Sequence, residues 1–155
     1  MFDYDHKLKD AGAVTSSGYG TVDEESKVVN LGAGLVRGNL VVDISAIKVS
    51  AKDEKYVLHL MGGTDASFTG QVSLASKELG AHGALEGNRD SKLSRIVIPF
   101  QNEERGIIYP YVRVRHVIAG SSPSINYTAR LEKDLPVTGT TGIDQAVTTT
   151  TTTTV

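Results

Sequence analysis

Short segments in which apolar and polar residues alternate are the sequence feature that most constrains the fold. Between residues 40 and 46 every even-numbered position is apolar, whereas Asp43 and Ser45 occupy odd-numbered positions. This period of two places the apolar side chains on one face of an extended strand. Comparable segments, many of them rich in Val, Ile and Tyr, recur at 28–31, 56–61, 71–75, 93–100, 107–118 and 124–132.

Glycines recur between these segments, 16 in all against 4 prolines. No stretch has the apolar spacing of a long amphipathic helix, since 73–79 offers at most about two turns before Gly80. The pattern predicts an all-β fold, an antiparallel jelly-roll or β-sandwich of about eight strands. Pro99 lacks an N–H group, so we expect the strand at 93–100 to lie at a sheet edge or to contain a bulge.

The composition changes at both ends of the chain. Residues 1–27 mix charged, small and glycine residues, and predict an N-terminal arm that wraps a neighbour or is loose. Residues 28–135 make up the predicted sandwich. Residues 136–155 form an extended, threonine-rich C-terminal tail. Ordering such a tail costs on the order of 1–2 kcal/mol per residue, so we expect it to be held as a strand along another chain or to lack order.

The charge balance argues against nucleic acid as a partner, and the lack of a long apolar run argues against a membrane. Lys plus Arg number 16 and Asp plus Glu 18, so a formal net charge of −2 offers no dense positive field for phosphates. No apolar run approaches the roughly 20 residues that span a bilayer, and we expect no signal peptide. We therefore expect neither nucleic acid nor a membrane as partner. The absence of cysteine excludes disulfides and thiolate chemistry.

Motifs for catalysis and metal binding are missing from the sequence. The four histidines lack the H-x-H or H-E-x-x-H spacing of metal ligands. The glycines between Gly32 and Gly38 miss the dinucleotide-binding spacing and open into a strand rather than a helix. No serine stands in G-x-S-x-G, and a glycosidase pair of distant carboxylates stays open. We expect no enzyme activity, no cofactor and no metal.

One polar face of the segment 107–118 is the best candidate for a contact surface. It carries Tyr109, Tyr111, Arg113 and Arg115 in alternation with mostly apolar residues. Tyrosine and arginine are enriched where proteins contact one another. The same pattern also suits the solvated outer face of an antiparallel sheet, so both interpretations stand.

The order and spacing of the strand segments form one pattern over roughly residues 5–132. It consists of DHKLKDAGAVT at 5–15, VVNLG at 28–32, LVVDI at 40–44, YVLHL at 56–60, RIVIP at 95–99, YVRVR at 111–115 and NYTARL at 126–131. This pattern resembles the jelly-roll capsid cement, or auxiliary decoration, proteins of tailed bacteriophages. The threonine tail departs from the pattern of that family.

The resemblance implies a structural virion protein without enzyme activity. Such a protein is made in the host cytoplasm, binds the outer surface of the phage head, and clamps neighbouring major capsid subunits to stabilise the shell. Its partners would be the major capsid protein and further copies of this chain, with a dimer favoured over a trimer. The arm and the tail would act as clasps. The candidate partner-binding residues are Phe2, Tyr4, Tyr109, Tyr111, Arg113, Arg115, Ile143, Val147 and Val155.

A carbohydrate-binding β-sandwich module on a virion or cell surface is the alternative interpretation. It predicts an exposed aromatic groove or a calcium site, together with glycan binding by the isolated domain. An enzyme ranks third, because it needs a convergent acid and base that the sequence does not indicate.

Overall fold

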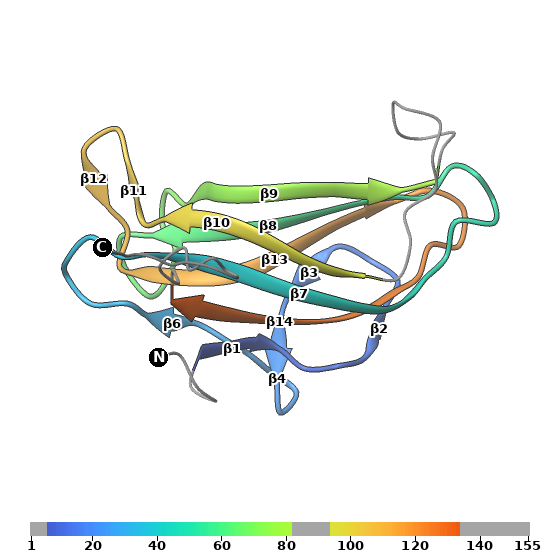
Figure 1. The fold of residues 1–155 in the computed structure, drawn as a ribbon, viewed down its shortest axis with the longest axis horizontal. Coiled ribbons are helices and arrows are strands. Elements are labelled where there is room, and N and C mark those ends of the chain that lie inside the picture. The colour runs from blue at the N-terminus through green and yellow to red at the C-terminus, as the bar shows by residue number, and fades with distance from the viewer. Residues whose placement is uncertain (1–5, 82–93, 134–155) are drawn as a thin grey trace, which may run out of the picture.

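The computed structural model describes residues 6–81 and 94–133, which form two antiparallel sheets packed face to face as a β-sandwich (Figure 1). The predicted all-β sandwich is therefore confirmed. Within these two ranges we find no helix with the length and hydropathy that crossing a bilayer requires.

The first sheet has five strands, in the order β1–β14–β7–β10, with β2 paired to the start of β14. Their bounds are β1 Lys7–Lys9, β2 Ala13–Val14, β7 Arg37–Ile47, β10 Arg95–Gln101 and β14 Ile125–Lys133. Among the described strands β10 is the edge of this sheet, which is one of the two outcomes that Pro99 predicted, because a residue without an N–H group is tolerated where no partner strand needs it.

The second sheet also has five strands, in the order β3–β13–β8–β9, with β6 paired to the start of β13. Their bounds are β3 Gly18–Tyr19, β6 Val29–Asn30, β8 Lys55–Gly63, β9 Val72–Gly80 and β13 Tyr111–Ala119. Two short hairpins complete the described structure. They are β4 Thr21–Val22 with β5 Glu25–Ser26, and β11 Glu103–Glu104 with β12 Ile107–Ile108.

The core lies between the sheets, where the alternation predicted it. Leu40 and Val42 of β7 are fully buried, and they face the other sheet's buried residues, which include Leu58, Leu60, Val112 and Val114. Burying one such side chain contributes about 1.5–3 kcal/mol. The alternation stops before Ala46, which is exposed. A register shift between Asn126 and Tyr127 of β14 accounts for this, because a bulge breaks the pairing there.

Most of the predicted strand segments are strands. Those at 40–47, 56–61, 93–100 and 124–132 correspond to β7, β8, β10 and β14. The segment at 107–118 is not one strand, since β12 ends at Ile108 and β13 begins at Tyr111. Pro110 lies between them, and a proline has no N–H group with which to continue a ladder.

The sandwich begins at Lys7 and not at residue 28, so most of the predicted N-terminal arm is part of it. Strands β1 and β2 join the first sheet, and β3 joins the second. Leu8 of β1 is 0% exposed. The charged residues around it suggested a loose segment, but pairing with β14 satisfies the backbone while Leu8 enters the core. Residues 1–5 and the predicted tail 136–155 lie outside the described residues.

Candidate functional site

The four predicted contact residues near β13 do not form one exposed face. Tyr109 precedes the strand and is only 6% exposed, and its N–H donates to the Asn102 carbonyl at 2.7 Å. Tyr111, Arg113 and Arg115 lie on the outer face of the second sheet and are each partly buried. The other predicted contact residues, Phe2, Tyr4, Ile143, Val147 and Val155, lie outside the described residues.

Arg113 is held between two aromatic rings. Its guanidinium carbon lies 3.7 Å from the ring centroid of Tyr19 and 4.1 Å from that of Phe68. Its Nη2 donates to Gln71 Oε1 at 3.0 Å, and Gln71 Nε2 donates to the Tyr19 hydroxyl at 3.2 Å. A flat guanidinium stacks favourably on aromatic faces in this way. Arg113 is therefore engaged within the chain through its stacking and its Nη2 group, while its buried Nε has no hydrogen-bond partner among the described residues.

The Arg113 stack also changes the electrostatics around Tyr19. The hydrogen bond from Gln71 lowers the pKa of the Tyr19 hydroxyl, and the charges of Arg113 and Arg115 act in the same direction, whereas burial opposes them. The stack links β3 to the loop 64–71 across the outer face of the second sheet. Of the predicted face, Tyr109 is buried, whereas Tyr111, Arg113 and Arg115 each retain part of their surface.

A buried polar cluster of Lys9, His116 and Tyr127 lies where β1 meets β13 and β14. The Lys9 ammonium donates to three carbonyls, those of Asp10 at 2.8 Å, Gly12 at 3.0 Å and Tyr127 at 2.9 Å. It also lies 4.5 Å from the Tyr127 ring centroid. His116 Nδ1 and the Tyr127 hydroxyl are 2.7 Å apart and share a hydrogen bond.

Burial dominates the protonation of this cluster. It lowers the pKa of His116 to about 4, with the Lys9 charge acting in the same direction, and it raises the pKa of Tyr127. Burial also lowers the pKa of Lys9, while the nearby Asp10 carboxylate opposes that shift. His116 is therefore neutral near pH 7.

The cluster borders a cavity of about 480 Å³ whose lining is part polar and part apolar and includes Lys9, Asp10 and His116. All three hydrogens of the Lys9 ammonium are already donated to backbone oxygens. A lysine in that position has no free donor for a ligand, so its role in this geometry is to hold the segment 10–12 against β14. Over residues 6–81 and 94–133, no group of three or more His, Cys, Asp or Glu side chains is arranged to hold a metal ion.

An apolar end, which we define by Leu35 and Ile107, is a feature that the sequence analysis missed. Leu35 is 52% exposed and Ile107 is 49% exposed. Ile107 lies on the β11–β12 hairpin, which projects from the same end of the sandwich as the loop 31–36 that carries Leu35 (Figure 1). Their sequence positions are far apart, so no local pattern signalled the pair.

Asn102 fixes the two parts of the apolar end to one another. It is 0% exposed. Its Oδ1 accepts from the Val36 N–H at 2.7 Å, and its Nδ2 donates to the Gly34 carbonyl at 3.1 Å. A buried side chain with both ends of its amide bonded holds the loop rigidly. The exposed side chains are therefore presented on fixed backbone.

All seven described aromatic side chains are buried or half-buried. The aromatic groove that the carbohydrate-binding alternative predicts is thus not present in the part of the chain that the structure covers.

Comparison with known proteins adds no relative, since no family model matches the chain and no curated protein matches its sequence.

Proposed function

We propose that the protein is a capsid cement protein with jelly-roll topology, which binds the outer surface of a tailed-phage head and bridges neighbouring major capsid subunits. It would act there as a structural virion protein, with the major capsid protein and further copies of itself as partners. The pattern of strand segments that resembles the cement family supports this proposal, and the two-sheet sandwich is consistent with it.

The observation that carries the proposal is the apolar end. Two large aliphatic side chains, Leu35 and Ile107, stand about half exposed on backbone that Asn102 holds in place. Exposed apolar side chains lose contact with water when a partner covers them, at about 25 cal/mol for each Å² buried. A rigid presentation also lowers the entropy that docking costs. Where one molecule, or copies joined to one another, makes several contacts of this kind, they become strong through effective concentration.

A reconstitution assay tests the proposal. Purified protein is mixed with undecorated heads assembled from the major capsid protein, and its occupancy is measured by electron microscopy together with the heat resistance of the particles. We expect the unsubstituted protein to decorate the heads and raise their heat resistance. Leu35→Asp with Ile107→Asp should lower occupancy about tenfold or more while leaving the melting temperature of the domain unchanged. Ser76→Asp, a new charge at an exposed site on β9, is the matched control and should bind normally.

Two outcomes would count against the proposal in different ways. Full occupancy by the Leu35→Asp, Ile107→Asp variant would remove the apolar end as the docking surface. Failure of the unsubstituted protein to bind heads, together with binding to glycans, would favour the carbohydrate-binding alternative.

A further inference from the structure

The outer face of the second sheet carries a row of polar side chains that crosses four strands. Tyr19 of β3 is in register with Arg115 of β13, and Arg115 is in register with His59 of β8. His59 is in register with Ser76 of β9. Directly opposed residues of an antiparallel pair turn their side chains to the same face, with Cβ atoms about 5 Å apart. We call these four residues the Arg115 row.

The Arg115 guanidinium, in the middle of this row, has unused donors. Within residues 6–81 and 94–133 it takes part in no hydrogen bond or ion pair. The nearby ring of Tyr19 has its centroid 6.0 Å from the guanidinium carbon. A guanidinium carries five N–H donors in a planar fork, so this group is available to an acceptor from outside the chain.

The two residues that flank Arg115 also offer polar groups. His59 Nδ1 and Ser73 Oγ are 3.0 Å apart and share a hydrogen bond, which leaves His59 Nε2 without a partner in the described part of the chain. Gln71 Nε2 donates to the Tyr19 hydroxyl at 3.2 Å, so the hydrogen of that hydroxyl remains available for donation. Three different polar groups thus stand side by side on this face.

No carboxylate pairs with the arginines of this face among the residues that the structure describes. Arg113 stands two residues before Arg115 and donates to the neutral amide of Gln71. The acidic residue closest to the row along β9, Glu78, is in an ion pair with Lys55 at 2.6 Å. The positive charge of the two guanidinium groups is therefore not compensated locally.

The ionisation of the flanking side chains responds to this charge. Burial lowers the pKa of His59, and the charge of Arg115 acts in the same direction. The hydrogen bond from Gln71 is the main cause that lowers the pKa of Tyr19, and the charges of Arg113 and Arg115 add to it. An anion bound at this place would be stabilised by the same charges.

We propose that the Arg115 row binds a carboxylate of an acidic segment on a partner protein. The planar fork of Arg115 matches a carboxylate, which accepts two parallel N–H bonds from it. Tyr19 supplies a hydroxyl donor from one neighbouring strand, and His59 supplies an N–H from the other when its ring is protonated. Tyrosine and arginine are also the residue types that contacts between proteins favour.

The charge of the whole chain favours a protein over a nucleic acid as this partner. The formal net charge of −2 repels a polyanion at a distance. Binding of nucleic acid depends on several phosphate contacts, whereas an acidic side chain needs one unpaired guanidinium. The inference does not rest on the proposed capsid function, because the row and the apolar end share no residue.

Titration with an acidic peptide tests the proposal. Full-length protein is titrated with octaglutamate in about 0.1 M salt, where charges more than about 10 Å apart are screened, and the dissociation constant is taken from NMR shifts. We expect Arg115→Gln to weaken binding about fivefold, because the ion pair in the middle of the row is lost. Ser76→Asp should weaken binding about threefold, because its carboxylate stands opposite His59 and competes with the peptide.

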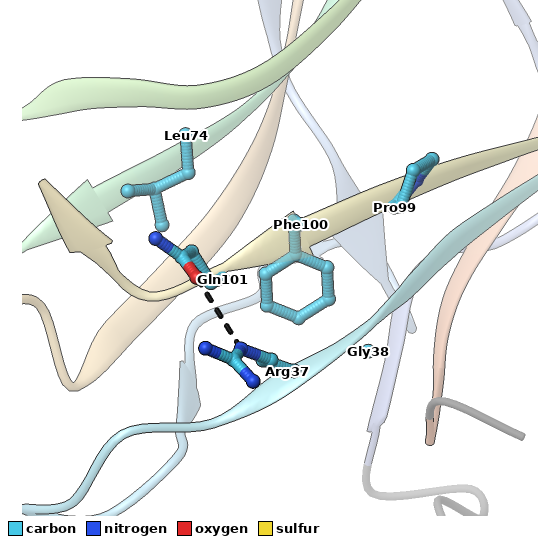
Figure 2. Close-up of a pocket in the computed structure, with 6 residues that line it drawn as sticks. All are labelled: Arg37, Gly38, Leu74, Pro99, Phe100 and Gln101. Atoms are coloured by element: carbon cyan, nitrogen blue, oxygen red, sulfur yellow. Dashed lines mark hydrogen bonds between the residues drawn. The ribbon is translucent and has the colours of Figure 1, made fainter. Parts of the chain in front are cut away.

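Arg37→Gln is the matched control. Arg37 is an exposed arginine of the first sheet, beside a recess of about 370 Å³, and its Nε donates to Gln101 Oε1 at 3.4 Å (Figure 2). The substitution removes the same charge from a different face, so the affinity should change by less than about 1.5-fold. All three variants should keep the melting temperature of the unsubstituted protein, because the substituted side chains are at least partly exposed.

The ionisation of His59 gives a second readout, which a purely structural role of Arg115 would not move. We expect octaglutamate to raise the pKa of His59, measured from the NMR shift of its ring protons, because a bound carboxylate favours the protonated ring. An unchanged pKa of His59 at saturating peptide would overturn the placement of the carboxylate on the row.

Four further results would overturn the proposal. They are no detectable binding of octaglutamate, equal binding by the unsubstituted protein and Arg115→Gln, an equal loss for Arg37→Gln, and tighter binding of an oligonucleotide of the same charge as the peptide. Decoration of phage heads through the apolar end is measured separately, so a failure here leaves the proposed function untouched.

Discussion

The two long sides of the sandwich are closed by different means. On the closed side, formed by β1, β3 and β4, the backbone itself joins the layers. There the Gly20 N–H donates to the Val114 carbonyl at 2.9 Å, and the Asp10 N–H donates to the Thr21 carbonyl at 2.9 Å. On the open side, β9 and β10 lie near one another as the edges of their sheets, and neither pairs with the other in the described ranges.

The sandwich covers its two long sides in different ways. On the closed side the N-terminal segment covers the edge, and the buried side chains of Lys9 and His116 lie beneath it. On the open side, β10 pairs only with β7 among the residues that the structure describes, and Val97 is exposed. Substitutions on the closed side should therefore cost much more stability than substitutions on the open side.

The largest loss is expected from Lys9→Met. Methionine keeps most of the volume of the lysine stem but leaves the carbonyls of Asp10, Gly12 and Tyr127 without their donor. We expect the free energy of unfolding, measured with urea, to fall by about 3–5 kcal/mol, since buried acceptors lose their partners. Lys77→Met on exposed β9 is the control, with an expected change within about 0.5 kcal/mol. A loss below about 1 kcal/mol for Lys9→Met would show that Lys9 does not hold the closed side together.

Acid should weaken the closed side through His116. Burial lowers its pKa from 6.5 to about 4 in the folded protein, so the unfolded chain binds more protons between these values. Stability is thus retained above about pH 6.5 and is lost as the pH falls toward 4, by about 3 kcal/mol from this group alone. Urea unfolding of the natural protein and of His116→Gln across this range checks the difference in slope. Identical slopes for the two proteins would contradict the assignment.

A matched pair of glycine substitutions compares the closed side with a loop. At Gly20 a Cβ would overlap the Leu8 carbonyl oxygen, whereas at Gly34 no atom lies within 4 Å of it. We expect Gly20→Ala to lower the free energy of unfolding by about 2–3 kcal/mol, because the obstacle is backbone. Gly34→Ala should change it by less than about 0.5 kcal/mol. Similar losses at both positions, measured by thermal unfolding, would mean that close approach at Gly20 does not limit the fold.

The smallest effect is expected on the open side. Val97→Thr keeps a β-branched side chain at an edge position that is 54% exposed. We expect the melting temperature to shift by no more than about 2 °C, which corresponds to a few tenths of a kcal/mol for a domain of this size. A loss comparable to that of Gly20→Ala would show that the open side is as tightly packed as the closed one.

Much of the sheet structure followed from local patterns. The alternation of Leu40, Val42 and Ile44 predicted which face of β7 is buried, because a strand turns successive side chains to opposite faces. Pro99 predicted an edge strand for the same kind of local reason. The segment around Leu8 was harder to interpret, since one buried leucine among charged residues has no periodic signal, and its pairing partner is more than 100 residues away.

The candidate site was less predictable than the fold. The sequence pattern placed Arg113 on an outer face as a candidate contact residue. In the structure its guanidinium stacks on the rings of Tyr19 and Phe68, which come from distant parts of the chain. The apolar end combines Leu35 and Ile107, which only the sandwich brings to the same end of the molecule. No spacing rule links residues of that separation.

The sequence by itself determined the all-β class, most of the main strands and the face of β7 that carries Leu40, Val42 and Ile44, because period-two alternation is a local property of the backbone. The tertiary structure alone decided that the N-terminal segment belongs to the sandwich, that Lys9 and His116 are buried, and which strands form the edges of the two sheets within residues 6–81 and 94–133. These outcomes depend on which strands pair and what covers them, and such contacts join residues far apart in the chain.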